Sequence, residues 1–176
     1  MSQPQKNASR STPLVERYAS GGAILRYAVT DLTPGHAAAH PGPGAWSVAE
    51  LAAHLVDCDL VFSDRMKRVI AEDDPVLQGF DESLWMTRLG SGQMPVGDAV
   101  DLLATNRVWM TPILRRCADT DFARTGRHTE AGTVTLADLL AKATNHLDHH
   151  LRFLYAKRAT LGVALPPRYA SEQLGI

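Results

Sequence analysis

Apolar residues recur every three or four positions in four stretches of this chain, a spacing typical of amphipathic helices. The clearest stretch begins at a capping box, in which Ser47 is the N-cap and Glu50 can reach back to it. It ends at the acidic, proline-bearing residues 72–75. Its apolar stripe consists of Val48, Leu51, Leu55, Cys58, Phe62, Met66 and Val69. We therefore predict a long helix with one face turned toward a core.

The stretches on either side of this helix have the same period. Residues 14–32 form the first stretch, although the adjacent Gly21 and Gly22 weaken a helix in its middle. Residues 96–117 form the third stretch, in which Pro112 should kink the helix or lie near its end. The apolar positions are Val15, Tyr18, Ile24, Leu25, Ala28 and Leu32, and then Val100, Leu103, Val108, Met110 and Leu114.

The fourth stretch carries both a start and a stop signal. Thr135 and Asp138 have the form of a second cap, and residues 136–161 carry the helical pattern. Gly162 follows as a natural C-terminal cap. We predict a helix between these signals.

The connections between the helices show no sustained period and are expected to be loops. They cover residues 33–45, 73–95 and 119–134, and no strand pattern stands out in them. The second connection is unusually long for a compact domain. If the second and third helices run parallel, this connection must return along the whole bundle, which extended chain can do. The pattern therefore predicts an all-α four-helix bundle with a long crossover between helices two and three.

The length of 176 residues suits one domain, which we place at residues 14–165 between tails at residues 1–13 and 166–176. A net charge of -1 gives no electrostatic footprint for nucleic acid, and no basic cluster could hold a membrane surface. The sequence contains no run of about 18 apolar residues, which is the length needed to span a membrane. The polar N-terminus lacks the apolar core of a signal peptide, so we expect a cytoplasmic protein. Cys58 and Cys117 are then interpreted as buried thiols, in preference to a disulfide or a catalytic thiol.

The histidines of the last helix indicate a metal site. His146 and His150 are four positions apart, so they lie on one helix face, about 6 Å apart along its axis. Two imidazoles at this spacing can reach a single ion, as in HExxH helices. The surrounding apolar residues turn this face toward the core, where an unpaired histidine pair is costly. His149 competes as the partner of His146, and spacing does not exclude it.

A third histidine, His54, lies on the inner side of the second helix. Taken alone, such a residue is more often a hydrogen-bonded core residue than a ligand. It could meet the pair whether the two helices run parallel or antiparallel. Three neutral imidazoles suit Zn²⁺, Ni²⁺ or Fe²⁺ better than Ca²⁺ or Mg²⁺. Three protein ligands with open positions are typical of a catalytic site.

Two regions resemble the motifs of DinB-like proteins. Residues 46–54, WSVAELAAH, are similar to the WSxxExxxH opening of the second helix in that family. Residues 124–128 (RTGRH), 132–136 (GTVTL) and 146–150 (HLDHH) resemble the stretch before and through the fourth helix. The resemblance covers roughly residues 14–162 in the order and type of elements.

This resemblance implies both a topology and a site. It implies an up-down-down-up bundle with a metal held by His54, His146 and His150. The superfamily includes bacillithiol- and mycothiol-dependent S-transferases and a mycothiol-dependent maleylpyruvate isomerase. Many other members are named only as metal-dependent hydrolases. No motif of this chain fixes the thiol or the electrophile.

Further residues are candidates for catalysis and substrate binding. Asp57 shares a helix face with the histidine of the second helix, and Asp59 stands where the family often has an acid. Both are candidate catalytic proton handlers, with hydrogen bonding to a ligand histidine favoured over general-base work. In the long connections, Trp85, Arg127 and His128 are candidate substrate-binding residues at the pocket entrance.

Two functional classes are open. One is a metal-dependent thiol S-transferase or hydrolase acting on a small electrophile, with mycothiol or bacillithiol as a candidate cosubstrate. The other is a non-catalytic bundle that binds metal or a partner. The charge near zero favours a small-molecule substrate over a polyanion. The sequence does not fix the oligomeric state, and a homodimer is one candidate.

Overall fold

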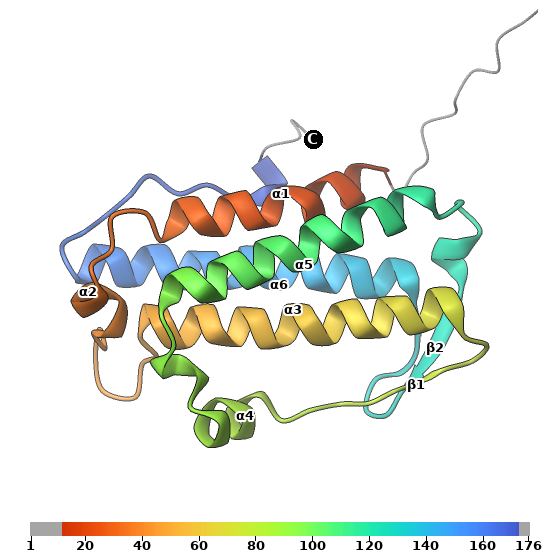
Figure 1. The fold of residues 1–176 in the computed structure, drawn as a ribbon, viewed down its shortest axis with the longest axis horizontal. Coiled ribbons are helices and arrows are strands. Elements are labelled where there is room, and N and C mark those ends of the chain that lie inside the picture. Colours follow the sequence, from red (N-terminus) through yellow and green to blue (C-terminus); the bar gives the residue numbers. More distant parts are fainter. Residues whose placement is uncertain (1–11, 173–176) are drawn as a thin grey trace, which may run out of the picture.

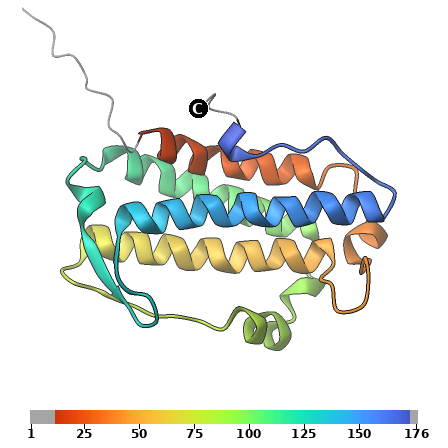
Figure 2. The same cartoon turned by 180° about the vertical axis from the view of Figure 1, so that it is seen from behind.

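Four long helices lie side by side in the computed structural model, which describes residues 12–172 without the side chains of Thr12 and Glu172. The helices are α1 (Thr12–Ala28), α2 (Pro34–Ala38), α3 (Val48–Ala71), α4 (Glu82–Leu89), α5 (Val96–Arg116) and α6 (Leu136–Thr160). α3 and α5 run in one direction, and α1 and α6 run in the other (Figures 1 and 2). The predicted up-down-down-up bundle with a long crossover is confirmed. None of the described helices is long and apolar enough to cross a membrane.

The helix starts follow the local chemistry of the sequence. Both predicted capping boxes form, one at Ser47 and Glu50 and the other at Thr135 and Asp138. The Ser47 amide donates to the Glu50 carboxylate at 2.7 Å, and the Glu50 amide donates to the Ser47 hydroxyl at 3.1 Å. These bonds satisfy amide groups that the first turn leaves free, and so they set where α3 and α6 begin.

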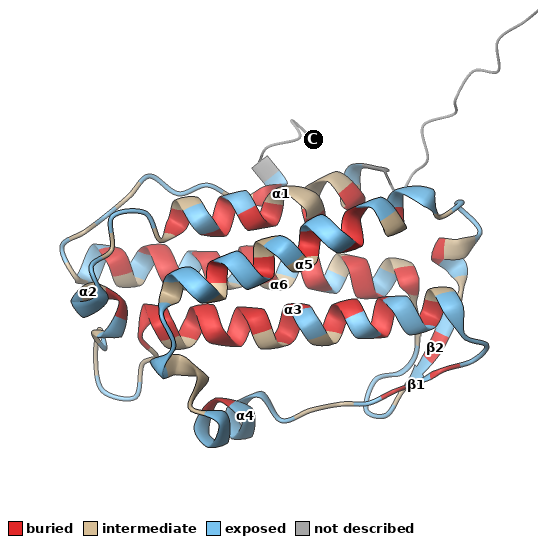
Figure 3. Cartoon of the chain, viewed as in Figure 1, coloured by how far each residue is buried: buried red, intermediate tan, exposed pale blue. Residues whose placement is uncertain are grey.

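The buried residues lie along the inward faces of the four long helices (Figure 3). One apolar cluster includes Tyr18, Met66 and Leu140, and a second includes Leu25 and Leu151. The prediction that Val108 belongs to this core was wrong, because its side chain is 73% exposed. The buried positions of α5 at this level are instead its polar residues Arg107 and Thr111. Because the buried residue at this level is the charged Arg107, the apolar pattern pointed instead to the next residue, Val108.

The paired glycines of α1 do not interrupt the helix. A Cβ at Gly21 would come within 2.0 Å of Arg107 Nη1 and 2.7 Å of Leu147. A Cβ at Gly22 would lie 2.8 Å from the Ala104 Cα of α5. The two glycines therefore cost some helix propensity but allow α1 to pack closely against α5 and the buried arginine.

The connections contain more regular structure than predicted. Three short strands, β1 (Val76–Leu77), β2 (Thr125–His128) and β3 (Gly132–Thr135), form one sheet, with β2 in its centre. β1 pairs with β2 in parallel, and β2 pairs with β3 antiparallel. The prediction that residues 73–95 and 119–134 are loops without strands was therefore wrong. Strands of two to four residues are too short to show a period of two in the sequence.

The chain after α6 packs back onto the bundle. Ala170 is fully buried, and its amide donates to the Asp148 carboxylate at 2.9 Å. The predicted C-terminal tail is thus anchored to the helices as far as the structure describes it. Residues 173–176, and residues 1–11 of the predicted N-terminal tail, lie outside the described residues.

Candidate metal centre

Three imidazoles meet between α3 and α6, which are antiparallel neighbours. The Nε2 atom of His54 lies 3.2 Å from that of His146 and 3.1 Å from that of His150. The Nε2 atoms of His146 and His150 are 3.1 Å apart. The three nitrogens therefore form a nearly equilateral triangle. His149, the alternative partner, is exposed and packs edge-on against Phe153.

The sequence around the histidines orients their rings. The α3 capping box fixes the start of the helix, so that His54 points inward and is only 2% exposed. The Trp46 ring lies 5.1 Å from the His54 ring, and the Phe62 ring lies 5.8 Å from the His146 ring. Trp46 also packs against the second apolar cluster, so it contacts both the core and the histidine cluster.

The triangle has the dimensions of a metal site. At a metal–nitrogen distance of about 2.05 Å, nitrogens 3.1–3.2 Å apart subtend roughly 100° at the ion. This angle lies between those of octahedral and tetrahedral coordination. Burial, together with the neighbouring histidines, lowers the pKa of His146 to about 3 and that of His150 to about 4. The imidazoles are then neutral near pH 7, so their lone pairs are free to bind a divalent ion.

Two further potential ligands approach the triangle, and sequence analysis assigned neither of them to the site. A Glu82 carboxylate oxygen lies 3.8 Å from His54 Nε2, and the Cys58 sulfur lies 3.7 Å from His54 Nδ1. Ligand atoms of these residues and of His146 all lie within 4.8 Å of one another. We favour the three-histidine set, because its atoms are closer together and because burial raises the pKa of the Cys58 thiol. Glu82 was missed because α4 is short, and its Asp81 cap is the only local signal.

The two candidate catalytic aspartates have different surroundings. Asp59 is 2% exposed, and its Oδ1 forms an ion pair with Arg107 at 2.7 Å. Its Oδ2 accepts a hydrogen bond from Asn106 at 2.7 Å, so both oxygens are occupied. Asp57 is half-buried, and burial raises its pKa. Its Oδ2 accepts a hydrogen bond from the Ser91 hydroxyl at 3.5 Å. The catalytic role of both residues stays a prediction, and Asp57 has the carboxylate with fewer partners.

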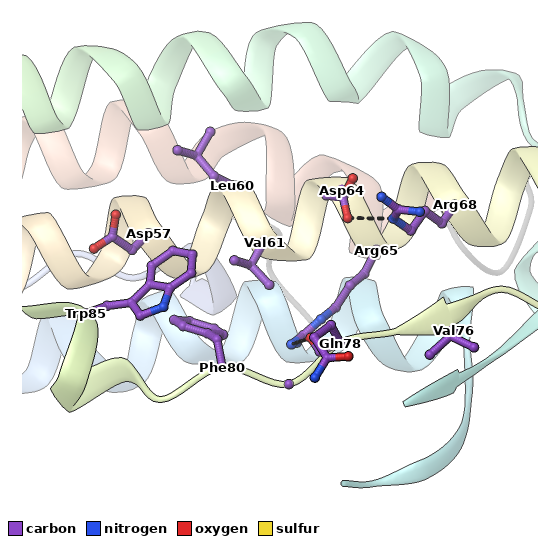
Figure 4. A pocket seen from close by; sticks show the side chains of 11 residues that line it. Asp57, Leu60, Val61, Asp64, Arg65, Arg68, Val76, Gln78, Phe80 and Trp85 are labelled. Carbon is purple, nitrogen blue, oxygen red and sulfur yellow. Dashed lines mark hydrogen bonds and ion pairs between the residues drawn. The ribbon is translucent and has the colours of Figure 1, made fainter. Parts of the chain in front are cut away.

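The structure separates the three candidate substrate-binding residues. Trp85 lines a pocket of about 620 Å³ between α3 and the crossover segment, and Asp57 lines the same pocket (Figure 4). Arg127 is exposed and pairs with Asp74 at 2.8 Å. His128 is half-buried, and its Nδ1 accepts two backbone amides of the β2–β3 turn. Neither of the last two residues lines this pocket.

Residues 18–154 match the family model of the DinB superfamily, so the chain belongs to this superfamily. A relative from Oceanobacillus iheyensis, named "Putative metal-dependent hydrolase", is 29% identical over 129 residues, which are 73% of this chain and 74% of that protein. A Geobacillus kaustophilus protein of the same name is 30% identical over 127 residues, covering 72% and 71% of the two chains.

A solved structure has the same fold. YfiT from Bacillus subtilis, described as "a probable metal-dependent hydrolase with an unusual four-helix bundle topology", superimposes with a TM-score of 0.80. The match covers 92% of this chain and 94% of YfiT at 22% identity. This match confirms the fold, and the match to the DinB superfamily model confirms the family resemblance seen in the sequence.

Proposed function

We propose that this chain holds a divalent transition-metal ion on His54, His146 and His150 and uses it to activate a nucleophile against a small electrophile. The reaction is either hydrolysis or transfer of a low-molecular-weight thiol. The observation that carries the proposal is the triangle of three Nε2 atoms 3.1–3.2 Å apart. The relatives from Oceanobacillus iheyensis and Geobacillus kaustophilus carry the name "Putative metal-dependent hydrolase", which supports the proposal.

The ion, when bound, lowers the pKa of a coordinated water or thiol, so that an anionic nucleophile is available near neutral pH. The protein contributes neutral imidazoles, of which that of His54 is buried and those of His146 and His150 are half-buried. Trp46 and Phe62 cover two of the rings with apolar surface. Three protein ligands also leave coordination positions for the reactants.

Two carboxylates could accept the proton that the nucleophile releases. Glu82 lies 3.8 Å from His54 Nε2 and is 49% exposed, so it can exchange a proton with solvent. Asp57 borders the pocket, and its raised pKa brings it closer to the range of a general base. We assign proton transfer to these two residues ahead of Asp59, whose carboxylate is held by Arg107.

Metal content tests the ligand set directly. Protein purified without added metal should contain close to one divalent transition ion per chain by elemental analysis. His150→Ala should lose this ion, because it removes one corner of the triangle. His149→Ala, the adjacent exposed histidine, is the matched control and should retain it. The opposite result for the two variants would refute the assignment.

Turnover tests the catalytic part. Metal-loaded protein should be assayed with a panel of esters, and with low-molecular-weight thiols plus a chlorinated aromatic acceptor that loses chloride. We expect activity that disappears in His54→Ala and falls in Glu82→Gln with metal content unchanged. Stoichiometric metal without turnover on any substrate of the panel would instead favour the non-catalytic bundle.

A further inference from the structure

A buried arginine lines the pocket beside the histidine cluster and has no ion-pair partner in the part of the chain that the structure describes. Arg65 is 7% exposed, and it reaches from α3 into the space beneath the crossover segment (Figure 4). Its Nη2 donates to the Gln78 carbonyl at 2.5 Å. Its Nε is buried without a hydrogen-bond partner among the described residues. Among the side chains that the structure describes, those of residues 13–171, no carboxylate lies within 4.0 Å of the guanidinium.

This situation differs from that of the other deeply buried arginines. Arg107 has the Asp59 carboxylate and two backbone carbonyls. Arg158 donates to three backbone carbonyls, those of Ala28, Thr30 and Val163. A buried guanidinium with donors to spare is costly unless an anion completes its coordination. Arg65 stands beside open space in which such an anion would fit.

The pocket also provides an apolar wall. The Phe80 ring lies 5.9 Å from the Arg65 guanidinium carbon, and the Trp85 ring lies 4.6 Å from the Phe80 ring. Trp85 and Asp57 form the end of the pocket nearest the histidines, because Glu82, one turn before Trp85 on α4, approaches His54. A ligand with its charge at Arg65 would therefore extend along the aromatic rings toward the candidate metal centre.

We propose that this pocket binds a small aromatic carboxylate, whose carboxylate pairs with Arg65 and whose ring lies against Phe80 and Trp85. The claim that such a carboxylate is the substrate of the reaction rests on the proposed function. The claim that the pocket binds it does not. A guanidinium matches a carboxylate in charge and in fork geometry. Glu130, an exposed residue whose carboxylate lies beside Gly79, attracts the guanidinium from within the protein and so competes with an external anion.

A purely structural role for Arg65 makes different predictions. In that case its bond to Gln78 and its contacts with Phe62 and Phe80 would only fix the crossover segment. Ligands that differ only in charge would then bind equally well. The two roles are therefore separated by comparing a carboxylate with its neutral amide.

The experiment is calorimetric titration of the full chain with 3-phenylpropionate and with 3-phenylpropionamide. We expect the acid to bind at least about tenfold more tightly than the amide, as a charge-assisted bidentate pair predicts. Arg65→Met should remove this preference. Arg68→Met is the matched control, because Arg68 lines the same pocket but is already paired with Asp64 at 2.8 Å, and it should keep the preference.

Two further variants complete the test. His54→Ala should still bind the acid, which separates failure of the metal proposal from failure of this one. Glu130→Gln should bind the acid more tightly, because it removes the competing carboxylate; this result is available even if Arg65→Met does not fold. Equal binding of acid and amide, or acid binding lost in His54→Ala and kept in Arg65→Met, would overturn the proposal.

Discussion

The buried ion pair between Asp59 and Arg107 allows a quantitative test of what Asp59 does. Replacing Asp59 by Asn keeps the shape but leaves the guanidinium without a counter-charge in the core. Both side chains are 2% exposed, so solvent cannot replace the lost partner. The new amide nitrogen would also meet Asn106 Nδ2, which donates to Asp59 Oδ2 at 2.7 Å. We therefore expect a large loss of stability.

Removing one partner of a buried ion pair costs about 3–5 kcal/mol, and we expect about 3 kcal/mol, because Asn can still accept from the guanidinium. This is a large fraction of the roughly 5–15 kcal/mol that stabilises a typical domain. With a urea m-value of about 2 kcal/mol/M, the unfolding midpoint should fall by roughly 1.5 M. Replacing both residues, as Asp59→Leu with Arg107→Met, should recover most of the loss.

The assay is urea unfolding followed by circular dichroism in a metal chelator, so that metal binding does not add to stability. Asp57→Asn is the matched control on the same helix, and it should lose no stability, because burial already disfavours the charged form of Asp57. The reasoning is refuted if Asp59→Asn unfolds at the wild-type midpoint. Loss of turnover with unchanged stability and metal content would show that Asp59 acts in catalysis.

Two other predictions concern packing and pH. Gly21→Ala should destabilise the protein by about 2 kcal/mol or more, because its Cβ would displace the buried arginine and break its ion pair. Gly97→Ala, whose Cβ meets nothing within 4 Å, should be neutral or stabilise by up to about 1 kcal/mol in the same urea assay. In chelator, the free energy of unfolding should fall as the pH drops from 7 to 5. The pKa values of His146 and His150, about 3 and about 4, lie below the value of about 6.5 expected in the unfolded chain, which therefore binds more protons in this range. A stability that is flat or rises toward pH 5 in urea titrations would contradict this.

The bundle could be predicted because its signals are local and repeated. The capping boxes at Ser47 and Thr135 fix two helix starts, and apolar residues every three or four positions fix the inward faces. The topology could be predicted because the long connection at residues 73–95, which has no helical periodicity, is consistent with parallel second and third helices. The placement of Val108 failed because a buried ion pair, made by Arg107, does not look apolar in the sequence.

The parts of the site on the four long helices were easier to predict than those on the connections. His54, His146 and His150 belong to helices, so their spacing could be converted into a shared face. Glu82 and Arg65 could not be found in this way. The approach of Glu82 depends on how the crossover folds over α3. Arg65 is distinguished by its buried Nε, which has no hydrogen-bond partner among the described residues. Neither property can be read from one stretch of sequence.

The parallel course of α3 and α5 has a consequence for how new specificity could arise in this architecture. It obliges residues 72–95 to pass over the pocket, so that one continuous segment supplies Phe80, Glu82 and Trp85 while the histidines stay on rigid helices. Doubling the length of a flexible connection costs only about 0.6 kcal/mol. Insertions or exchanges in this segment can therefore reshape the ligand cavity without disturbing the imidazole triangle. Grafting the crossover of one relative onto the bundle of another should therefore exchange this wall of the pocket while leaving the histidines in place.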